Sequence, residues 1–216
     1  MSKSDKDTRD KFVILCQDGV KFLRRNKKKF GAVITSIPEM MEVGMDEKHY
    51  LTFFRRAANA AMESVKDDGY AIFYQTDRKH HGIIDKSYLI TDEAMKLGYR
   101  MMFHKIALIK NVDMKDLYKP TYSHLLCYSK NGTPGAATPD VFHRGKSLYS
   151  HGAGIEAMKR SVEFLKSKDI NIVVDPFVGR GTSLIVAKQL GIEYGIGIDI
   201  DEKQCSEAEK NLSKVK

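Results

Sequence analysis

The sequence has few cysteines, and they form no pattern that binds a metal or builds a disulfide framework. Cys16, Cys127 and Cys205 are far apart, and their number is odd. Disulfide scaffolds and zinc sites use closely spaced cysteines, often as Cys-x-x-Cys pairs. We therefore expect three reduced thiols in an intracellular protein, and no bound metal.

Long apolar runs are absent as well, and so are internal repeats. A membrane-spanning helix needs roughly 18 or more apolar residues in succession, and a secretory signal peptide needs an apolar core behind a basic start. The polar residues 1–7 do not begin such a segment. The composition therefore predicts a protein that is neither secreted nor embedded in a membrane. Its 216 residues suffice for one domain with a large core.

Positive charge is in excess. The formal net charge is +8 and the isoelectric point is about 9.2. This balance favours a polyanionic partner such as nucleic acid, because Lys and Arg neutralise phosphates and release counterions. The densest basic run, residues 21–29, has six basic residues in nine positions. Such a run is typical either of a solvated helix end and turn or of a patch that contacts phosphates.

Short apolar runs alternate with stretches of helical periodicity along the chain. The runs are rich in branched and aromatic residues, as strands are, and apolar residues recur at helical spacing between them. This alternation predicts an α/β fold with a mainly parallel sheet of about seven strands and helices on both faces. Strands are expected at residues 12–16, 32–35, 70–74, 101–109, 125–128, 170–174 and 194–200, and helices at 50–65, 87–96, 154–166 and 183–190.

Two features refine this architecture. Residues 101–110 and 123–130 are joined by a polar loop without a helix, so we expect an antiparallel pair at one edge of the sheet, which makes the sheet mixed. Residues 130–139 are dense in turn formers. We therefore expect a single domain over residues 12–216 with a surface loop near 130–150, preceded by a flexible N-terminus at 1–11.

A strand, a glycine-containing turn and a helix follow one another near residue 175. Residues 171–175 have the character of a buried strand, Gly179 and Gly181 lie in the turn, and residues 183–188 favour a helix. Glycine lets a ligand approach the backbone closely, and a helix N-terminus offers unpaired amide groups. The next strand ends in Asp199, whose carboxylate can accept hydrogen bonds from both hydroxyls of a ribose. The unit therefore predicts binding of an adenosine-containing cofactor.

A dinucleotide fits this unit less well than S-adenosylmethionine does. Dinucleotide sites of the Gly-x-Gly-x-x-Gly type place a third glycine after the second, and here that position is Leu184. S-adenosylmethionine supplies the same ribose hydroxyls to Asp199.

Two segments carry a family resemblance. Asp175-Pro176-Phe177-Val178-Gly179-Arg180-Gly181-Thr182 and the later Gly195-Ile196-Gly197-Ile198-Asp199-Ile200-Asp201 resemble the cofactor signature of the permuted, beta-class amino-methyltransferases, which modify adenine or cytosine bases, mostly in DNA. The resemblance covers roughly residues 12–213 and implies a Rossmann-like class I methyltransferase fold with permuted motif order. It implies S-adenosylmethionine as cofactor, bound by Asp18, Gly19, Asp175, Pro176, Phe177, Gly179, Gly181, Thr182, Asp199 and Ile200.

The resemblance extends to both sides of this signature. Residues 13–19 resemble the opening strand and acidic turn of the family, which implies that Asp18 lies near the adenine or methionine part of the cofactor. Residues 151–156 take the place of the family's cofactor-contacting motif before the glycine loop, although its usual proline and lysine are absent.

Ser36-Ile37-Pro38-Glu39 stands where the family carries Asp, Asn or Ser, then two prolines and an aromatic residue. Ser36 and Pro38 match this pattern, whereas Ile37 and Glu39 do not. In the resembling enzymes the polar side chain and a backbone carbonyl accept hydrogen bonds from the exocyclic amino group, and the aromatic residue stacks on a flipped base. The resemblance implies Ser36, Pro38 and Glu39 as catalytic residues. Glu39 would act as a general base or hydrogen-bond acceptor, or it is a plain surface carboxylate.

The polar residues after the strand at 70–74 are candidates for substrate binding. Strand ends in a parallel sheet border the ligand crevice, so we expect Tyr74, Asp77, Arg78 and Lys79 to contact the substrate.

Two further groups have an ordinary interpretation beside a functional one. His80 and His81 have no third ligand at metal spacing, so they predict solvent-exposed histidines rather than a zinc site. Residues 118–124 mix aromatic and basic side chains, which suits either nucleotide stacking or ordinary loop packing.

Three functions remain open on the sequence alone. The first is an S-adenosylmethionine-dependent methyltransferase of a nucleobase amino group in nucleic acid. Structured RNA is slightly preferred over DNA, because the chain after residue 130 leaves too little room for a large target-recognition domain. The second is a catalytically weak or inactive partner or assembly factor that keeps the fold. The third is methylation of a protein or small molecule, which Glu39 also suits. A homodimer or heterodimer is compatible with each of these functions.

Overall fold

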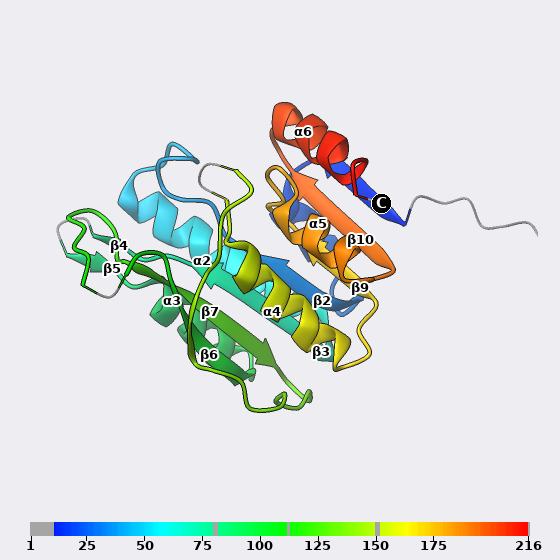
Figure 1. Cartoon of the computed structure of the whole chain (residues 1–216), viewed down its shortest axis with the longest axis horizontal. Coiled ribbons are helices and arrows are strands. Elements are labelled where there is room, and N and C mark those ends of the chain that lie inside the picture. Colours follow the sequence, from blue (N-terminus) through cyan, green and yellow to red (C-terminus); the bar gives the residue numbers. More distant parts are fainter. Residues whose placement is uncertain (1–10, 80–81, 112, 150–151, 216) are drawn as a thin grey trace, which may run out of the picture.

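The computed structural model describes residues 11–79, 82–111, 113–149 and 152–215 and shows one large sheet with helices on both faces (Figure 1). The N-terminus expected to be flexible, residues 1–11, lies outside these ranges except for Lys11. The strands of the large sheet are β1 (Phe12–Cys16), β2 (Phe30–Thr35), β3 (Val65–Gln75), β6 (Arg100–Leu108), β7 (Tyr122–Ser129), β8 (Val141–His143), β9 (Ile172–Asp175) and β10 (Tyr194–Asp199). A separate hairpin consists of β4 (Arg78–Lys79) and β5 (Ile83–Ile84).

The large sheet is mixed, as the sequence predicts. Its order is β1-β10-β9-β2-β3-β7-β6-β8. The first five strands in this order are parallel, and β7 runs antiparallel to both β3 and β6. The expected antiparallel pair is present but does not form the edge, because β8 pairs in parallel with β6. β8 brings the strands to eight and lies within the segment expected as a surface loop; three residues are too few to show a recognisable alternation.

Within the described ranges, helices cover both faces of the sheet, three on each. Successive side chains of a strand point to opposite faces, and β3 shows this clearly. Phe73 lies in the same buried cluster as Phe54, whereas Ile72 lies with Met158 in a second cluster on the other side. The first group of helices is α1 (Gly19–Arg25), α2 (Glu47–Ser64) and α3 (Lys86–Lys96), and the second is α4 (Ile155–Lys166), α5 (Thr182–Gln189) and α6 (Glu202–Leu212) (Figure 1).

Aspartate side chains begin four of the helices. Asp18, Asp46, Asp85 and Asp201 each accept a hydrogen bond from a backbone amide in the first turn of α1, α2, α3 and α6. Such caps satisfy amides that a helix start leaves unpaired. α5 begins differently, because its N-cap is Gly181, which has no side chain to accept these amides. The first amides of α5 therefore stay available for another acceptor.

The carboxyl ends of the parallel strands gather polar residues at one edge of the sheet. β9 ends at Asp175 and β10 at Asp199, and the segments after β1, β2 and β3 carry Asp18, Ser36 and Asp77. The registers of neighbouring strands bring these ends to a similar level. In open α/β sheets, ligands bind at this edge.

Candidate active site

The glycine turn after β9 forms an open backbone loop at the carboxyl edge. Gly179 has a φ of 52° and Gly181 a φ of 94°, values in the left-handed region that favours glycine. The amide of Val178 donates to the carbonyl of Ile198 at 2.9 Å, which ties the loop to β10. A Cβ built on Gly179 would meet no atom within 4 Å, so open space adjoins the loop. Thr182, the first residue of α5, is buried.

Asp175 is a buried anchor of this loop. Its carboxylate accepts hydrogen bonds from Thr35 Oγ1 at 2.9 Å, from the Phe177 amide at 3.1 Å and from Ser183 Oγ at 2.5 Å. These donors belong to β2, the loop and α5, so one side chain connects all three. Burial raises the pKa of Asp175 to about 6, against the opposing effect of the hydrogen bonds. The side chain fixes the geometry of the loop from inside the protein.

The turn after β1 packs against the same loop. A Cβ built on Gly19 would lie 2.0 Å from the carbonyl oxygen of Pro176, so a larger residue does not fit there. Asp18 caps α1 by accepting a hydrogen bond from the Lys21 amide at 3.0 Å, and 34% of its side chain stays exposed. Phe177 is half-buried against the core beneath α2. The predicted cofactor residues of the two segments are therefore in contact.

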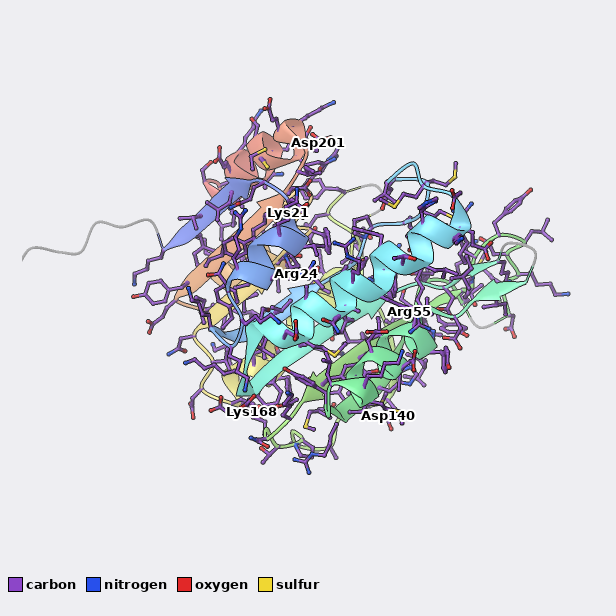
Figure 2. The ribbon with its side chains drawn as sticks, turned by 180° about the vertical axis from the view of Figure 1, so that it is seen from behind. Lys21, Arg24, Arg55, Asp140, Lys168 and Asp201 are labelled. Atoms are coloured by element: carbon purple, nitrogen blue, oxygen red, sulfur yellow. The ribbon has the colours of Figure 1, made fainter. Side chains whose placement is uncertain are left out.

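Asp199 lies beside the glycine loop at the end of β10. Its Oδ2 accepts a hydrogen bond from the Gly179 amide at 2.9 Å, and its Oδ1 accepts one from the Asp201 amide at 3.0 Å. An ionised carboxylate has about four acceptor positions, so both oxygens can still accept hydroxyl groups of a ligand. Ile200 follows with 75% of its surface exposed, which leaves apolar surface next to the carboxylate. Figure 2 marks Asp201 at the start of α6.

The segment before α4 reaches the start of α5. A Cβ on Gly152 would lie 3.6 Å from Thr182 Oγ1, and Gly154 is the N-cap of α4. His151, the first residue of the motif expected at 151–156, lies outside the described residues. The described part of the motif therefore adjoins the predicted cofactor loop.

The loop after β2 carries the three predicted catalytic residues. Ser36 is exposed, and Pro38 and Glu39 are half-buried. The Pro38 carbonyl accepts a hydrogen bond from the Tyr50 hydroxyl at 3.1 Å, and Glu39 Oε1 accepts one from Lys86 Nζ at 2.7 Å. The Glu39 carboxylate is thus paired with a cation from inside the protein and does not stand alone at the surface.

The four predicted substrate residues differ in exposure. Tyr74 and Asp77 are buried, and the Tyr74 hydroxyl has no hydrogen-bond partner in the described structure. Arg78 and Lys79 form β4 and are half-buried. Lys79 Nζ donates to the Asp116 carbonyl at 2.7 Å. Arg78 and Lys79 bring positive charge to the carboxyl edge, whereas Asp77 takes part in an internal network.

This network contains residues that the sequence did not suggest. Asp77 Oδ1 accepts a hydrogen bond from the Lys86 amide at 2.8 Å, and Asp77 Oδ2 lies 3.0 Å from His124 Nε2. His124 Nδ1 lies 2.8 Å from His104 Nε2. His124 belongs to β7, as the strand expected at residues 123–130 implies, although it also falls in the mixed segment 118–124. Partners this far apart in sequence have no local pattern that reveals them.

The basic run at residues 21–29 forms α1 and the turn after it. In that turn, Lys27 Nζ lies 2.9 Å from a carboxylate oxygen of Glu63, and Lys28 Nζ lies 3.0 Å from one of Asp67. These ion pairs are solvent-exposed, and such pairs stabilise a fold only weakly. The run therefore forms a helix end and a turn in which Lys27 and Lys28 are already paired with carboxylates.

Two findings concern only the part of the chain that the structure describes. No three His, Cys, Asp or Glu side chains there are grouped to hold a metal ion. No helix in the same ranges is long and apolar enough to span a bilayer. His80 and His81, expected as solvent-exposed histidines, lie outside the described residues.

Comparison with known proteins links this site to one family. Residues 154–210, which include the glycine loop and Asp199, match the family model of N6 and N4 methyltransferases described as DNA methylase. Type II methyltransferase M.HinfI of Haemophilus influenzae is 43% identical over 61 residues. The aligned segment covers 28% of this chain but only 17% of M.HinfI.

The fold has relatives over nearly the whole chain. A candidate DNA modification methylase from Thermus thermophilus superimposes with a TM-score of 0.73 at 17% identity, covering 95% of each chain. The cytosine-N4-specific PvuII DNA methyltransferase superimposes with a TM-score of 0.74 at 14% identity, covering 94% of this chain and 86% of that one. At these identities the likeness establishes the fold.

The sequence match and the structural match cover different extents of the chain. The sequence match is confined to the C-terminal part, and the structural likeness takes in both halves of the sheet. The predicted resemblance to the amino-group methyltransferases is thus confirmed, in sequence over residues 154–210 and in fold over nearly the whole chain.

Proposed function

We propose that this protein uses S-adenosylmethionine to methylate the exocyclic amino group of adenine or cytosine in DNA. The observation that carries the proposal is the glycine loop with Asp199 hydrogen-bonded beside it, at the edge where α/β sheets bind ligands. DNA replaces the structured RNA that the sequence slightly favoured, because no comparison supports RNA, the matching family model is described as DNA methylase, and the PvuII enzyme is named as a DNA methyltransferase.

The residues present fit the cofactor. The Asp199 oxygens retain acceptor positions for the ribose hydroxyls, and the open space at Gly179 lets the cofactor approach the backbone. Ile200 offers exposed apolar surface for the adenine ring, and the half-exposed Asp18 lies across the loop to accept polar groups of the cofactor. The relative from Thermus thermophilus has also been solved in complex with S-adenosyl-L-methionine, which supports this choice.

The loop after β2 supplies the methyl acceptor's environment. The cofactor supplies a methyl group on a positively charged sulfur. Transfer of that methyl group would form a carbon–nitrogen bond at the amino group and break the carbon–sulfur bond, so that the cofactor would leave as a neutral thioether. The surplus proton on nitrogen would pass to water, which the exposed Ser36 adjoins. Ser36 Oγ and the Pro38 carbonyl would each accept one hydrogen bond from the amino group and so orient its lone pair. Such a step requires alignment more than strong acid–base groups.

Arg78 and Lys79 provide the expected contact to DNA phosphates. Both lie in β4, which follows the carboxyl end of β3. Because β3 is the neighbour of β2, this segment lies on the same side of the sheet's carboxyl edge as the candidate catalytic loop. Phosphate contacts position a nucleic acid, while base contacts select the target. We propose that residues 12–216 act as one methyltransferase domain in which this edge holds both cofactor and base.

The test is transfer of labelled methyl from S-adenosylmethionine into unmodified DNA, RNA and protein, offered separately. Label in DNA, recovered after digestion as N6-methyladenine or N4-methylcytosine, is the expected result. Label in RNA or protein alone contradicts the assignment of DNA. Cofactor binding without transfer to any fraction overturns the enzymatic proposal and favours a partner or assembly role. The Gly179→Ala/Gly181→Ala variant is the control that should neither bind nor transfer.

A further inference from the structure

A fully buried lysine lies next to the candidate catalytic loop. The side chain of Lys86 is 0% exposed, and its Nζ lies 2.7 Å from Glu39 Oε1. The same Nζ lies 5.9 Å from the ring centroid of Tyr50 and 6.0 Å from that of Phe54. Lysine is almost never fully buried unless it is paired. Burial lowers the pKa of Lys86, and Glu39 opposes that effect.

Lys86 also contacts the second loop at this edge. Its backbone amide donates to Asp77 Oδ1 at 2.8 Å, so one residue bonds the loop after β2 through its side chain and the loop after β3 through its main chain. Asp77 is held in turn by His124, and His124 by His104. The chain of contacts runs from the catalytic loop across β7 to β6.

Stability does not account for this arrangement. Taking the Lys86 ammonium out of water costs several kcal/mol, whereas Glu39 keeps 25% of its side chain exposed. Well-packed apolar residues in place of a buried ion pair are often as stable or more so. The pair instead fixes a position, because Glu39 Oε1 is hydrogen-bonded to a fully buried Nζ. The Tyr50 hydroxyl bonded to the Pro38 carbonyl fixes the neighbouring residue. Ser36 lies three residues from Glu39 on the same short loop.

We propose that Lys86 is a positioning residue for methyl transfer, which holds Glu39 so that Ser36 and the loop carbonyls face the amino group of the base. The inference rests on the proposed function. Lys86 lies beneath the acceptor side of the site, whereas the cofactor residues Gly179 and Asp199 belong to the other half of the sheet. Loss of the pair should therefore affect turnover and leave cofactor binding intact.

The variants to compare are Lys86→Met, Glu39→Gln and the double variant Lys86→Met/Glu39→Gln. The double variant leaves no unpaired buried charge, so it should regain the stability that Lys86→Met loses. The matched control is Lys105→Met. Lys105 is another buried lysine, lies on β6, and has its Nζ 3.0 Å from Asp140 Oδ1. Kinetics of DNA methylation, the Kd for S-adenosylmethionine and thermal unfolding are measured for each.

We expect kcat to fall by about 10- to 100-fold in all three variants, since a displacement of about 1 Å can cost that much. The cofactor Kd should stay within about twofold, and the double variant should be no slower than the slower single variant, because both residues act as one unit. A stable double variant with the kcat of the unaltered protein overturns the proposal. So does a parallel loss of cofactor affinity.

A second readout does not depend on activity. The amides of Glu42 and Val43 donate to the Glu39 carbonyl at 2.9 and 3.2 Å, so their hydrogen exchange reports the order of the loop. In the double variant we expect exchange at these amides to rise about tenfold or more, with the Ile185 amide of α5 unchanged. Unchanged hydrogen exchange at Glu42 and Val43 overturns the positioning role of Lys86. This result can be obtained whether or not the protein transfers methyl groups. Failure of the positioning role is therefore distinguishable from failure of the proposed function, which would show as an absence of methyl transfer.

Discussion

Gly19 and Pro176 are in direct contact across the candidate cofactor site. A Cβ at residue 19 would lie 2.0 Å from the Pro176 carbonyl oxygen and 2.9 Å from its carbonyl carbon. These are backbone atoms, so the neighbour cannot rotate away. The start of α1 and the glycine loop therefore hold each other in place.

Gly19→Ala should destabilise the protein and weaken cofactor binding together. The clash forces α1 and the loop apart, and overpacking of this kind typically costs about 1 to 3 kcal/mol. Chemical denaturation gives the change in unfolding free energy, and titration gives the Kd for S-adenosylmethionine. Gly31→Ala is the control, because the nearest atoms to its Cβ would be side-chain carbons of Ile170 at 3.3 Å and of Ile172 at 3.6 Å, which can shift. Equal effects of the two variants would contradict the proposed contact.

Gly179→Ala should weaken cofactor binding by about tenfold or more, and it should lower the stability of the fold by the cost of a left-handed alanine. A left-handed alanine costs roughly 1 to 2 kcal/mol, and the new methyl group would enter the open space next to Asp199. Gly98→Ala is the matched control, since Gly98 has a φ of 74° and likewise meets nothing within 4 Å, but lies in the turn before β6. Similar cofactor Kd values in both variants would show that strain alone is responsible.

Asp175→Asn should change how stability depends on pH. The pKa of Asp175 is about 6 in the folded protein against 3.8 without the fold. Between these two pH values the folded state therefore binds more protons than the unfolded state. The stabilising contribution of this group is present below about pH 4 and is lost as the pH rises through 6. At 1.36 kcal/mol per pKa unit, the loss is roughly 3 kcal/mol.

Asparagine cannot lose a proton, yet it keeps the acceptor for Thr35 and Phe177. The unfolding free energy of Asp175→Asn, relative to that of the unaltered protein, should therefore rise by roughly 3 kcal/mol between pH 4 and pH 7. Urea denaturation of both proteins at several pH values provides the comparison. A difference in unfolding free energy that does not vary with pH would show that Asp175 is already ionised at pH 4 in the folded state.

Arg78→Ala should weaken DNA binding and make it less sensitive to salt. If Arg78 neutralises one phosphate, the slope of log K against log salt concentration should fall by about 0.9. Lys28→Ala is the control. Lys28 precedes β2, so it lies at the amino ends of the parallel strands and away from the carboxyl ends, and its Nζ is already paired with Asp67 at 3.0 Å. Equal slopes for Arg78→Ala and the unaltered protein would remove Arg78 from the interface.

Much of the fold could be predicted because most strands and helices are continuous periodic segments. β1 has the predicted bounds, whereas β3 begins at Val65, five residues before the predicted Tyr70. Residues 66–69 are polar or glycine and have no strand character of their own. They extend β3 because Val65 pairs with Phe30 at the start of β2. Such a strand is determined by its neighbour and not by its own composition.

The candidate site also contains residues that the sequence could predict and residues that it could not. Gly179 and Asp199 are 20 residues apart and follow a local spacing, so the sequence alone indicated them. Lys86 and His124 are each 47 residues from the carboxylates they contact. In the sequence, a lysine at the start of a helix predicts a solvated surface residue. Only the folded structure shows that Lys86 is buried.

The pairing of β1 with β10 also bears on how the protein is made. Among the described strands, β1 is hydrogen-bonded to β10 alone, at the edge of the sheet. Roughly 180 residues separate the two, and ribosomes add about 5 to 20 residues per second. β1 therefore waits roughly 10 to 40 seconds for its neighbour, while β2, β3, β6 and β7 can already assemble with α2 and α3 on the nascent chain. The cofactor half of the sheet closes last, after the acceptor half has formed.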